Sequence, residues 1–166
     1  MTNPTKFYSS KQEKLVADYL VWEVVSGSGA RFQPGDVRSA VWLGECKTHS
    51  ESDHKILFER KVWDKICREA MSQLRAPVLF VDDGSQSISQ TWCMIPVSKV
   101  PVTDPAVVAS PFPHPVRVNV TLSSDTALAK YKSDCIAAGV DIICWVTKDV
   151  AILPLEKFKQ FIKEHL

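Results

Sequence analysis

The pattern of apolar and polar positions in the first half of the chain predicts a helix, two strands, a second helix and a third strand. Apolar residues recur at helical spacing from Ser10 to about Trp22, and this stretch opens with a capping-box sequence, Ser10-Lys11-Gln12-Glu13. Helical spacing returns over 56–74. Short apolar segments predict strands at 37–40 and 41–47, which would pair as a tight hairpin, and at 77–81. A strand, a crossing helix and another strand imply at least one parallel pair.

The second half of the chain is less regular. Six prolines between residues 96 and 115 predict an extended, irregular segment. Apolar segments around it predict strands at 92–97, 117–122, 141–146 and 150–153, and helical spacing predicts helices at 126–138 and 155–166. The two halves together predict an α/β fold in which a mixed β-sheet is flanked by helices.

Length and composition fit one globular domain. The chain has 166 residues, of which 45% are hydrophobic and 23% are charged, and these values are typical of a soluble domain. No apolar segment approaches the roughly 20 residues that cross a bilayer, so we expect no membrane association. The five cysteines contain no C-x-x-C pair, which argues against a zinc ribbon and favours reduced thiols in the cytoplasm.

The charge of the chain is nearly balanced, with 20 basic and 19 acidic residues. A nucleic-acid-binding domain is often far more basic. The balance therefore does not by itself indicate a polyanionic partner, although acidic residues gathered in a metal site would mask a basic face.

The clearest chemical pattern is formed by Asp36, Glu45 and Lys47. Side chains alternate along a strand, so Glu45 and Lys47 share one face. Hairpin pairing would return Asp36, at the start of the partner strand, to a position beside Glu45. Two convergent carboxylates suit Mg²⁺, which prefers oxygen ligands and keeps positions for water and a phosphate oxygen. A lysine beside them can hold a phosphate or orient a water, so the set fits metal-dependent phosphodiester hydrolysis.

Glu13 has two interpretations. It shares a face of the predicted first helix with Val16, Ala17 and Leu20, and this face would turn it toward the sheet as a third carboxylate. It also stands where a glutamate completes the capping box with Ser10. The sequence leaves both interpretations open.

These residues and their surroundings resemble the PD-(D/E)XK nuclease superfamily. Asp36 followed by Glu45-Cys46-Lys47 matches the motif of that superfamily. The helix glutamate, the Ser/Gly-rich loop that ends in Arg31, and the Pro-Val-Leu strand narrow the resemblance to archaeal-type Holliday-junction resolvases and their phage relatives. The resemblance covers about residues 9–82.

The resemblance implies a single nuclease domain with a restriction-endonuclease-like core over about 9–82 and 141–166, and an insertion over about 84–140. It implies Mg²⁺ or Mn²⁺ as cofactor and Lys47 as the catalytic lysine. The implied metal ligands are three side chains and one backbone carbonyl: Glu13, Asp36, Glu45 and the carbonyl of Cys46. A homodimer that cleaves branched DNA is implied as well, in the cytoplasm or, for a phage enzyme, in the host cytoplasm. The candidates for contact with nucleic acid are Arg31, Ser28 and Lys14.

Other functions stay open at this stage. A flap-directed or sequence-directed nuclease would use the same site. A nuclease-derived module could instead bind DNA or protein without catalysis, although the intact set of Asp36, Glu45 and Lys47 argues against this. A stripe of basic residues on the second predicted helix is interpreted as a solvated face rather than a DNA contact: Lys61, Lys65 and Arg68.

Overall fold

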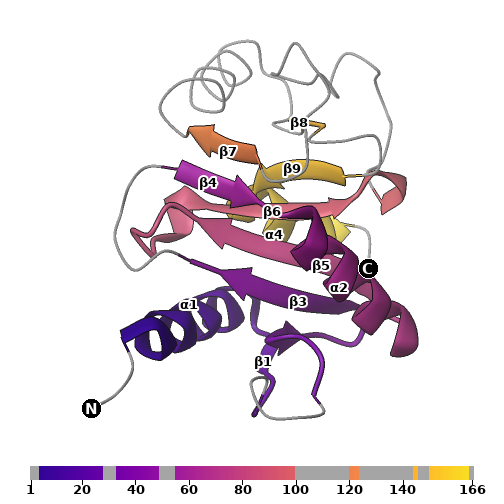
Figure 1. The fold of residues 1–166 in the computed structure, drawn as a ribbon. Helices are drawn as coiled ribbons and strands as arrows, with labels where there is room; N and C mark the ends of the chain where they lie inside the picture. The colour runs from indigo at the N-terminus through magenta and orange to yellow at the C-terminus, as the bar shows by residue number, and fades with distance from the viewer. Residues whose placement is uncertain are drawn as a thin grey trace.

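The computed structural model describes residues 4–27, 33–48, 55–99, 120–123, 144–145 and 150–164. Within these residues the chain forms an α/β fold with a mixed sheet of seven strands and a separate pair of strands (Figure 1). The helices are α1 (Pro4–Leu20), α2 (Arg60–Ser72) and α4 (Leu155–Glu164), with short 3₁₀ turns η1 (Ile88–Gln90) and η2 (Val97–Lys99). The strands are β1 (Glu23–Val24), β2 (Val37–Arg38), β3 (Trp42–Lys47), β4 (Lys55–Phe58), β5 (Ala76–Asp82), β6 (Thr91–Pro96), β7 (Val120–Ser123), β8 (Cys144–Trp145) and β9 (Val150–Pro154).

The order of strands in the main sheet is β1-β2-β3-β5-β6-β9-β8. The strands β1, β2 and β3 form an antiparallel meander, and β3 then pairs in parallel with β5. The connection between β3 and β5 contains α2, because parallel neighbours need a long crossover. The strands β5, β6, β9 and β8 continue the sheet with antiparallel pairs, while β4 forms a separate antiparallel pair with β7.

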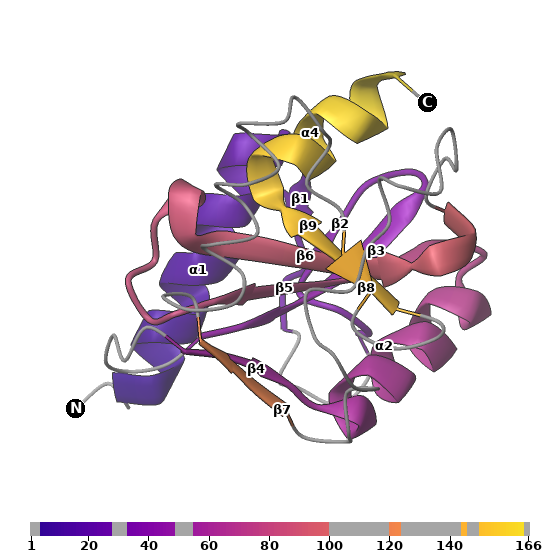
Figure 2. The ribbon, with the colours of Figure 1, turned by 90° about the horizontal axis from the view of Figure 1, so that it is seen from above.

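The two faces of the main sheet carry separate hydrophobic cores. The helices α1 and α4 cover one face and α2 covers the other (Figure 2). Phe158 of α4 lies at the centre of the first core, in edge-to-face contact with the rings of Trp42 and Phe80. On the second face, Trp63 and Ile66 of α2 are buried against side chains of the central strands. Alternation along β3 therefore assigns its even-numbered residues to one core and its odd-numbered residues to the α2 face.

The predicted hairpin and crossover are confirmed. Residues 37–47 contain the antiparallel pair β2–β3, and a helix joins β3 to its parallel neighbour β5. The predicted strands at 92–97 and 150–153 and the closing helix from Leu155 also match β6, β9 and α4. Of the predicted strands at 117–122 and 141–146, residues 120–122 and 144–145 are described and extended. The predicted helix at 126–138 and most of the proline-rich segment lie outside the described residues.

Two predicted helix starts are wrong. The first helix begins at Pro4 rather than Ser10, since proline is well suited to a first helical position. Ser10 therefore lies inside the helix, and the capping-box interpretation fails. The second helix begins at Arg60 rather than Ile56, because Lys55–Phe58 pairs with β7 as a strand.

The strand β6 belongs to the main sheet. It lies within the range 84–140 that the resemblance assigned to an insertion, yet it pairs with both β5 and β9. Its residues Trp92–Ile95 are buried. At least this part of the range is therefore central to the sheet rather than added to it.

Loss of the Phe158 ring tests whether α4 is integral to the fold. We expect Phe158→Ala to lower the free energy of unfolding by about 3–5 kcal/mol, because the ring is fully buried and its removal leaves a cavity. Phe7→Ala makes the same change at an exposed position and is expected to cost far less. Urea unfolding monitored by circular dichroism gives both values, and equal small losses would contradict the packing of α4.

Candidate active site

A tight turn before β2 sets the position of Asp36. Gly35 has a φ of +71°, and a Cβ at this position would lie 2.7 Å from Leu43 Cδ1. Only glycine combines this backbone conformation with so close an approach. The Asp36 N–H donates to the Gly44 carbonyl at 2.7 Å, and the register of β2 with β3 places Asp36 opposite Glu45.

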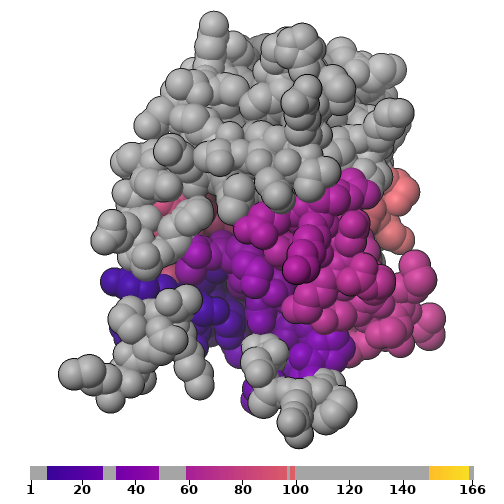
Figure 3. All heavy atoms as spheres, in the orientation of Figure 1, coloured from indigo at the N-terminus to yellow at the C-terminus, as the bar shows by residue number. Residues whose placement is uncertain are grey.

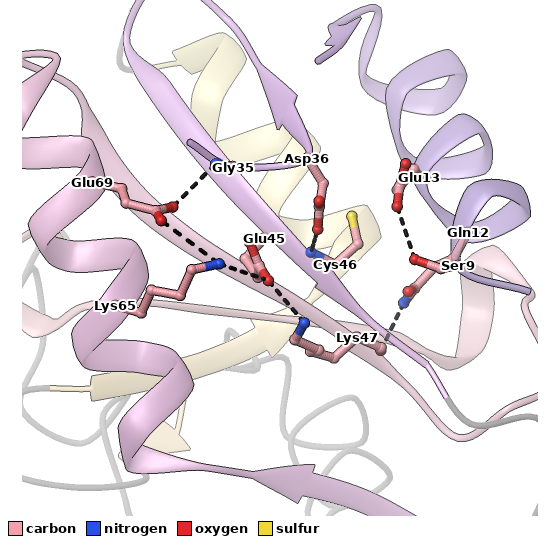
Figure 4. A network of polar contacts seen from close by, with 10 residues as sticks. All are labelled: Ser9, Gln12, Glu13, Gly35, Asp36, Glu45, Cys46, Lys47, Lys65 and Glu69. Atoms are coloured by element: carbon pink, nitrogen blue, oxygen red, sulfur yellow. Dashed lines mark hydrogen bonds and ion pairs between the residues drawn. The ribbon is translucent and has the colours of Figure 1, made fainter. Parts of the chain in front are cut away.

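Asp36 is a buried carboxylate with one well-defined partner. The residue is 9% exposed, and its Oδ2 accepts a hydrogen bond of 2.8 Å from the Cys46 N–H (Figure 4). Burial raises the pKa of Asp36, and the negative charge of Glu45 raises it further, to about 6, against the lowering effect of the Cys46 hydrogen bond. Asp36 therefore lies where a negative charge is poorly stabilised by the protein alone.

Glu45 and Lys47 project from the same face of β3 and form an ion pair. Lys47 Nζ lies 2.8 Å from Glu45 Oε1, and the Glu45 residue is 5% exposed while the lysine side chain is half exposed. Burial lowers the pKa of Lys47, but the hydrogen bond and charge of Glu45 outweigh it and leave the pKa raised. The ammonium group is therefore charged at neutral pH, with one side open to solvent.

Two residues of α2 complete this polar network, and sequence reasoning missed their role. Lys65 Nζ lies 3.5 Å from Glu45 Oε1 and 3.6 Å from Glu69 Oε1, while Glu69 Oε2 accepts a hydrogen bond of 3.1 Å from the Gly35 N–H. The sequence predicts Lys65 as part of a solvated stripe on this helix. Its side chain is half exposed, but its ammonium group faces Glu45. The spacing of Lys65 and Glu69 by four residues is the signal in the sequence for an ion pair.

Cys46 faces the opposite side of β3 from Glu45. The residue is buried, and burial followed by the nearby charge of Asp36 raises the pKa of its thiol well above the usual value. The side chain packs in the hydrophobic core under α1 and α4, on the other face of the strand from the Glu45 carboxylate. The implied role of Cys46 rests on its backbone carbonyl and stays a prediction.

Glu13 lies near Asp36, but its hydrogen bond is to another residue of α1. Glu13 lies on α1, where its Oε1 accepts a hydrogen bond of 2.8 Å from Ser9 Oγ, one turn earlier in the helix. Its charge contributes to the raised pKa of Asp36, so the two carboxylates lie near each other. The interpretation of Glu13 as a cap is wrong, and its interpretation as a metal ligand stays a prediction.

Gln12 is a further residue that sequence reasoning passed over. It is fully buried, and its Nε2 donates to the Lys47 carbonyl at 2.9 Å, which ties α1 to the end of β3. Its Oε1 is buried and has no hydrogen-bond partner among the residues that the structure describes. The sequence does contain a signal for this burial, because Gln12 lies on the apolar face of a helix, four residues before the buried Val16.

A pocket of about 200 Å³ opens beside Lys47. It is lined by residues from the ends of β3 and β5 and from the start of α2: Lys47, Thr48, Glu59, Val62, Leu79, Val81 and Asp82. Ligands of α/β proteins commonly bind at the carboxyl ends of parallel strands. The pocket gives a substrate group space next to the lysine.

Of the predicted nucleic-acid contacts, only Lys14 is described. It is exposed on α1, and its Nζ pairs with Asp18 Oδ2 at 2.7 Å. Arg31 and Ser28 lie outside the described residues. In the described part of the chain, no helix is long and apolar enough to span a membrane.

The donor set fits Mg²⁺ better than a metal that needs a closed protein cage. Among the described residues, no group of three or more His, Cys, Asp or Glu side chains is arranged to hold a metal ion. Mg²⁺ is usually bound through one or two carboxylates together with waters and substrate phosphates. Asp36 and Glu45 are both buried and close enough for the charge of Glu45 to raise the pKa of Asp36, so they could supply these carboxylates.

Comparisons of the chain with protein-family models, with curated proteins and with solved structures found no match.

The raised pKa of Asp36 predicts a pH-dependent stability. The carboxyl ionises near pH 3.8 in the unfolded chain and near 6 in the folded protein, so the folded state binds the proton more tightly. This contribution to stability is present below pH 3.8 and is lost as the pH rises through 6. We expect Asp36→Asn, which keeps an oxygen for the Cys46 N–H, to be more stable than the parent protein above pH 6 by up to about 3 kcal/mol.

Urea unfolding at pH 4 and pH 8, in the presence of a chelator, measures this difference. The gain should be nearly absent at pH 4. Asp18→Asn, which changes an exposed aspartate of α1, serves as the control and should show little gain at either pH. An equal gain for Asp36→Asn at both pH values would contradict the raised pKa.

Proposed function

We propose that the protein is a metal-dependent DNA endonuclease with a restriction-endonuclease-like core. The observation that carries the proposal is the convergence of Asp36, Glu45 and Lys47 at the β2–β3 hairpin, with both carboxylates buried. The order of a helix, a three-stranded meander, a helix and a parallel strand supports it, since this frame places the motif residues on adjacent strands. Perturbed titratable groups that cluster beside a pocket favour a functional over a structural role.

Asp36 and Glu45 would hold the divalent cation, Mg²⁺ or Mn²⁺, with the Cys46 carbonyl and Glu13 as further implied ligands. Such a cation supplies Lewis-acid stabilisation of the charge that develops on the phosphate and makes a water more acidic. The raised pKa of Asp36 supports cation binding, because a divalent charge would relieve the repulsion between the two carboxylates.

Lys47 would contact the scissile phosphate or orient the attacking water. Its ammonium group is charged, pairs with Glu45 and lines the adjacent pocket. A compact positive charge at this point stabilises the additional negative charge of the transition state. Gln12 would hold the lysine's backbone in place through the Lys47 carbonyl.

Branched DNA is the proposed substrate, and a homodimer acting in the cytoplasm, or in the host cytoplasm for a phage protein, is the proposed working form. Both follow from the resemblance to Holliday-junction resolvases. A flap-directed or sequence-directed nuclease would use the same three residues, Asp36, Glu45 and Lys47. A DNA- or protein-binding module would not require charged side chains at these positions.

Cleavage assays test the site and the substrate together. We expect the parent protein with Mg²⁺ or Mn²⁺ to cut a four-way junction in preference to a flap or a plain duplex of the same sequence. Asp36→Asn and Glu45→Gln should each lower the rate at least about 100-fold, and Lys47→Met by a similar factor, since each removes charge from the reacting centre. Gel analysis of end-labelled DNA measures the rates.

Two controls separate a lost site from a lost fold. Asp18→Asn should retain the parental cleavage rate, and Asp36→Asn should retain most of the DNA affinity measured by gel shift. Full cleavage by Asp36→Asn or Glu45→Gln would refute the site. Preferential cutting of a flap or a duplex would keep the nuclease and reject the branched substrate.

A further inference from the structure

A second lysine faces the proposed metal centre from α2. The sequence motif accounts for Lys47 alone, but Glu45 Oε1 has two ammonium groups near it, Lys47 at 2.8 Å and Lys65 at 3.5 Å (Figure 4). Lys47 lies on β3 with Glu45, and Lys65 lies on α2. Their ammonium groups therefore reach Glu45 from two directions. One carboxylate oxygen thus connects the strand of the motif to the helix that covers it.

Lys65 is held less closely than Lys47. Its distances to Glu45 and to Glu69, 3.5 Å and 3.6 Å, exceed the 2.7–2.9 Å that is usual for a charge-assisted hydrogen bond. Half of its side chain is exposed, and α2 lies at the surface of the molecule (Figure 3). Lys65 therefore has an ammonium group that is directed at the site and accessible from solvent.

Glu69 keeps this lysine in place and fixes the turn that carries Asp36. One of its carboxylate oxygens accepts the Gly35 N–H at 3.1 Å, and the other faces Lys65. The same side chain thus connects Lys65 to the residue before Asp36. Lys65 and the two proposed metal ligands are positioned by one continuous set of contacts.

We propose that Lys65 binds a phosphate oxygen of the DNA substrate beside the metal centre. The proposal rests on the nuclease function proposed above. Glu45 cannot keep both ammonium groups close while it also ligates a divalent cation, since like charges repel. Lys65 is the more distant and more loosely held of the two, so it is the group that contacts the phosphate. Glu69 holds it in position.

The test is single-turnover cleavage of a four-way junction with Mg²⁺, measured over a range of protein and salt concentrations. Lys65→Met should raise the half-saturating protein concentration roughly 10-fold or more, the usual effect of losing a hydrogen bond to a charged group. The slope of log affinity against log salt should fall by about one. Lys65→Arg, which keeps the charge and the donors, should restore most of the affinity.

Lys61→Met is the matched control, because Lys61 is an exposed lysine one turn earlier on the same helix. It measures the effect of losing one positive charge from α2. Urea unfolding of each variant checks the fold.

The outcomes separate the two proposals. If the parent protein cleaves the junction but Lys65→Met behaves like Lys61→Met, the role of Lys65 is refuted and the nuclease stands. A fall in the maximal rate without a change in half-saturation would also refute phosphate binding and make Lys65 a positioning residue. If the parent protein cleaves no DNA with Mg²⁺ or Mn²⁺, both proposals fail.

Discussion

Two carboxylates buried side by side are the constraint around which this end of the molecule is organised. Asp36 lies just before β2 and Glu45 lies on the neighbouring strand β3, both with little exposure to water, and burial of like charges is costly. The structure compensates for them with the Cys46 N–H, the Lys47 ammonium and the Lys65 ammonium. The raised pKa of Asp36 shows that the compensation is incomplete.

The strand β3 joins this polar site to the hydrophobic core. Trp42 and Cys46 face the core under α1 and α4, whereas Leu43 and Glu45 face α2. Gly44 lies between them because a Cβ there would approach the Phe80 ring to 2.5 Å and Val37 to 2.8 Å. Packing on one face of the strand therefore fixes the position of the Glu45 carboxylate on the other face, because a close-packed sheet leaves the strand little freedom to move.

Local sequence patterns predicted the elements that create the site. The hairpin, the crossover helix and the approach of Asp36 to β3 follow from strand alternation and turn chemistry, which act over a few residues. The patterns failed where partners are distant in sequence. Residues 55–58 form a strand only because β7 pairs with them, and the contacts of Glu69 with Gly35 and of Gln12 with Lys47 span 34 and 35 residues. The first helix begins at Pro4, six residues before Ser10, so a short motif such as a capping box did not define its start.

The cost of burying these charges also bears on whether the residues serve the fold or a ligand. A buried group of charges is seldom the most stable solution for a fold, since apolar residues of similar volume often serve as well or better. Backbone pairing together with Gly35 and Gly44 sets the register of the hairpin, and neither of these requires a charge on Asp36 or Glu45. Two lysines and a pocket lie beside them, an arrangement that suits the proposed binding of a cation and a phosphate. Under the proposed function, the carboxylates would bind the cation, and the two ammonium groups would then bind the phosphate whose ester bond is cleaved.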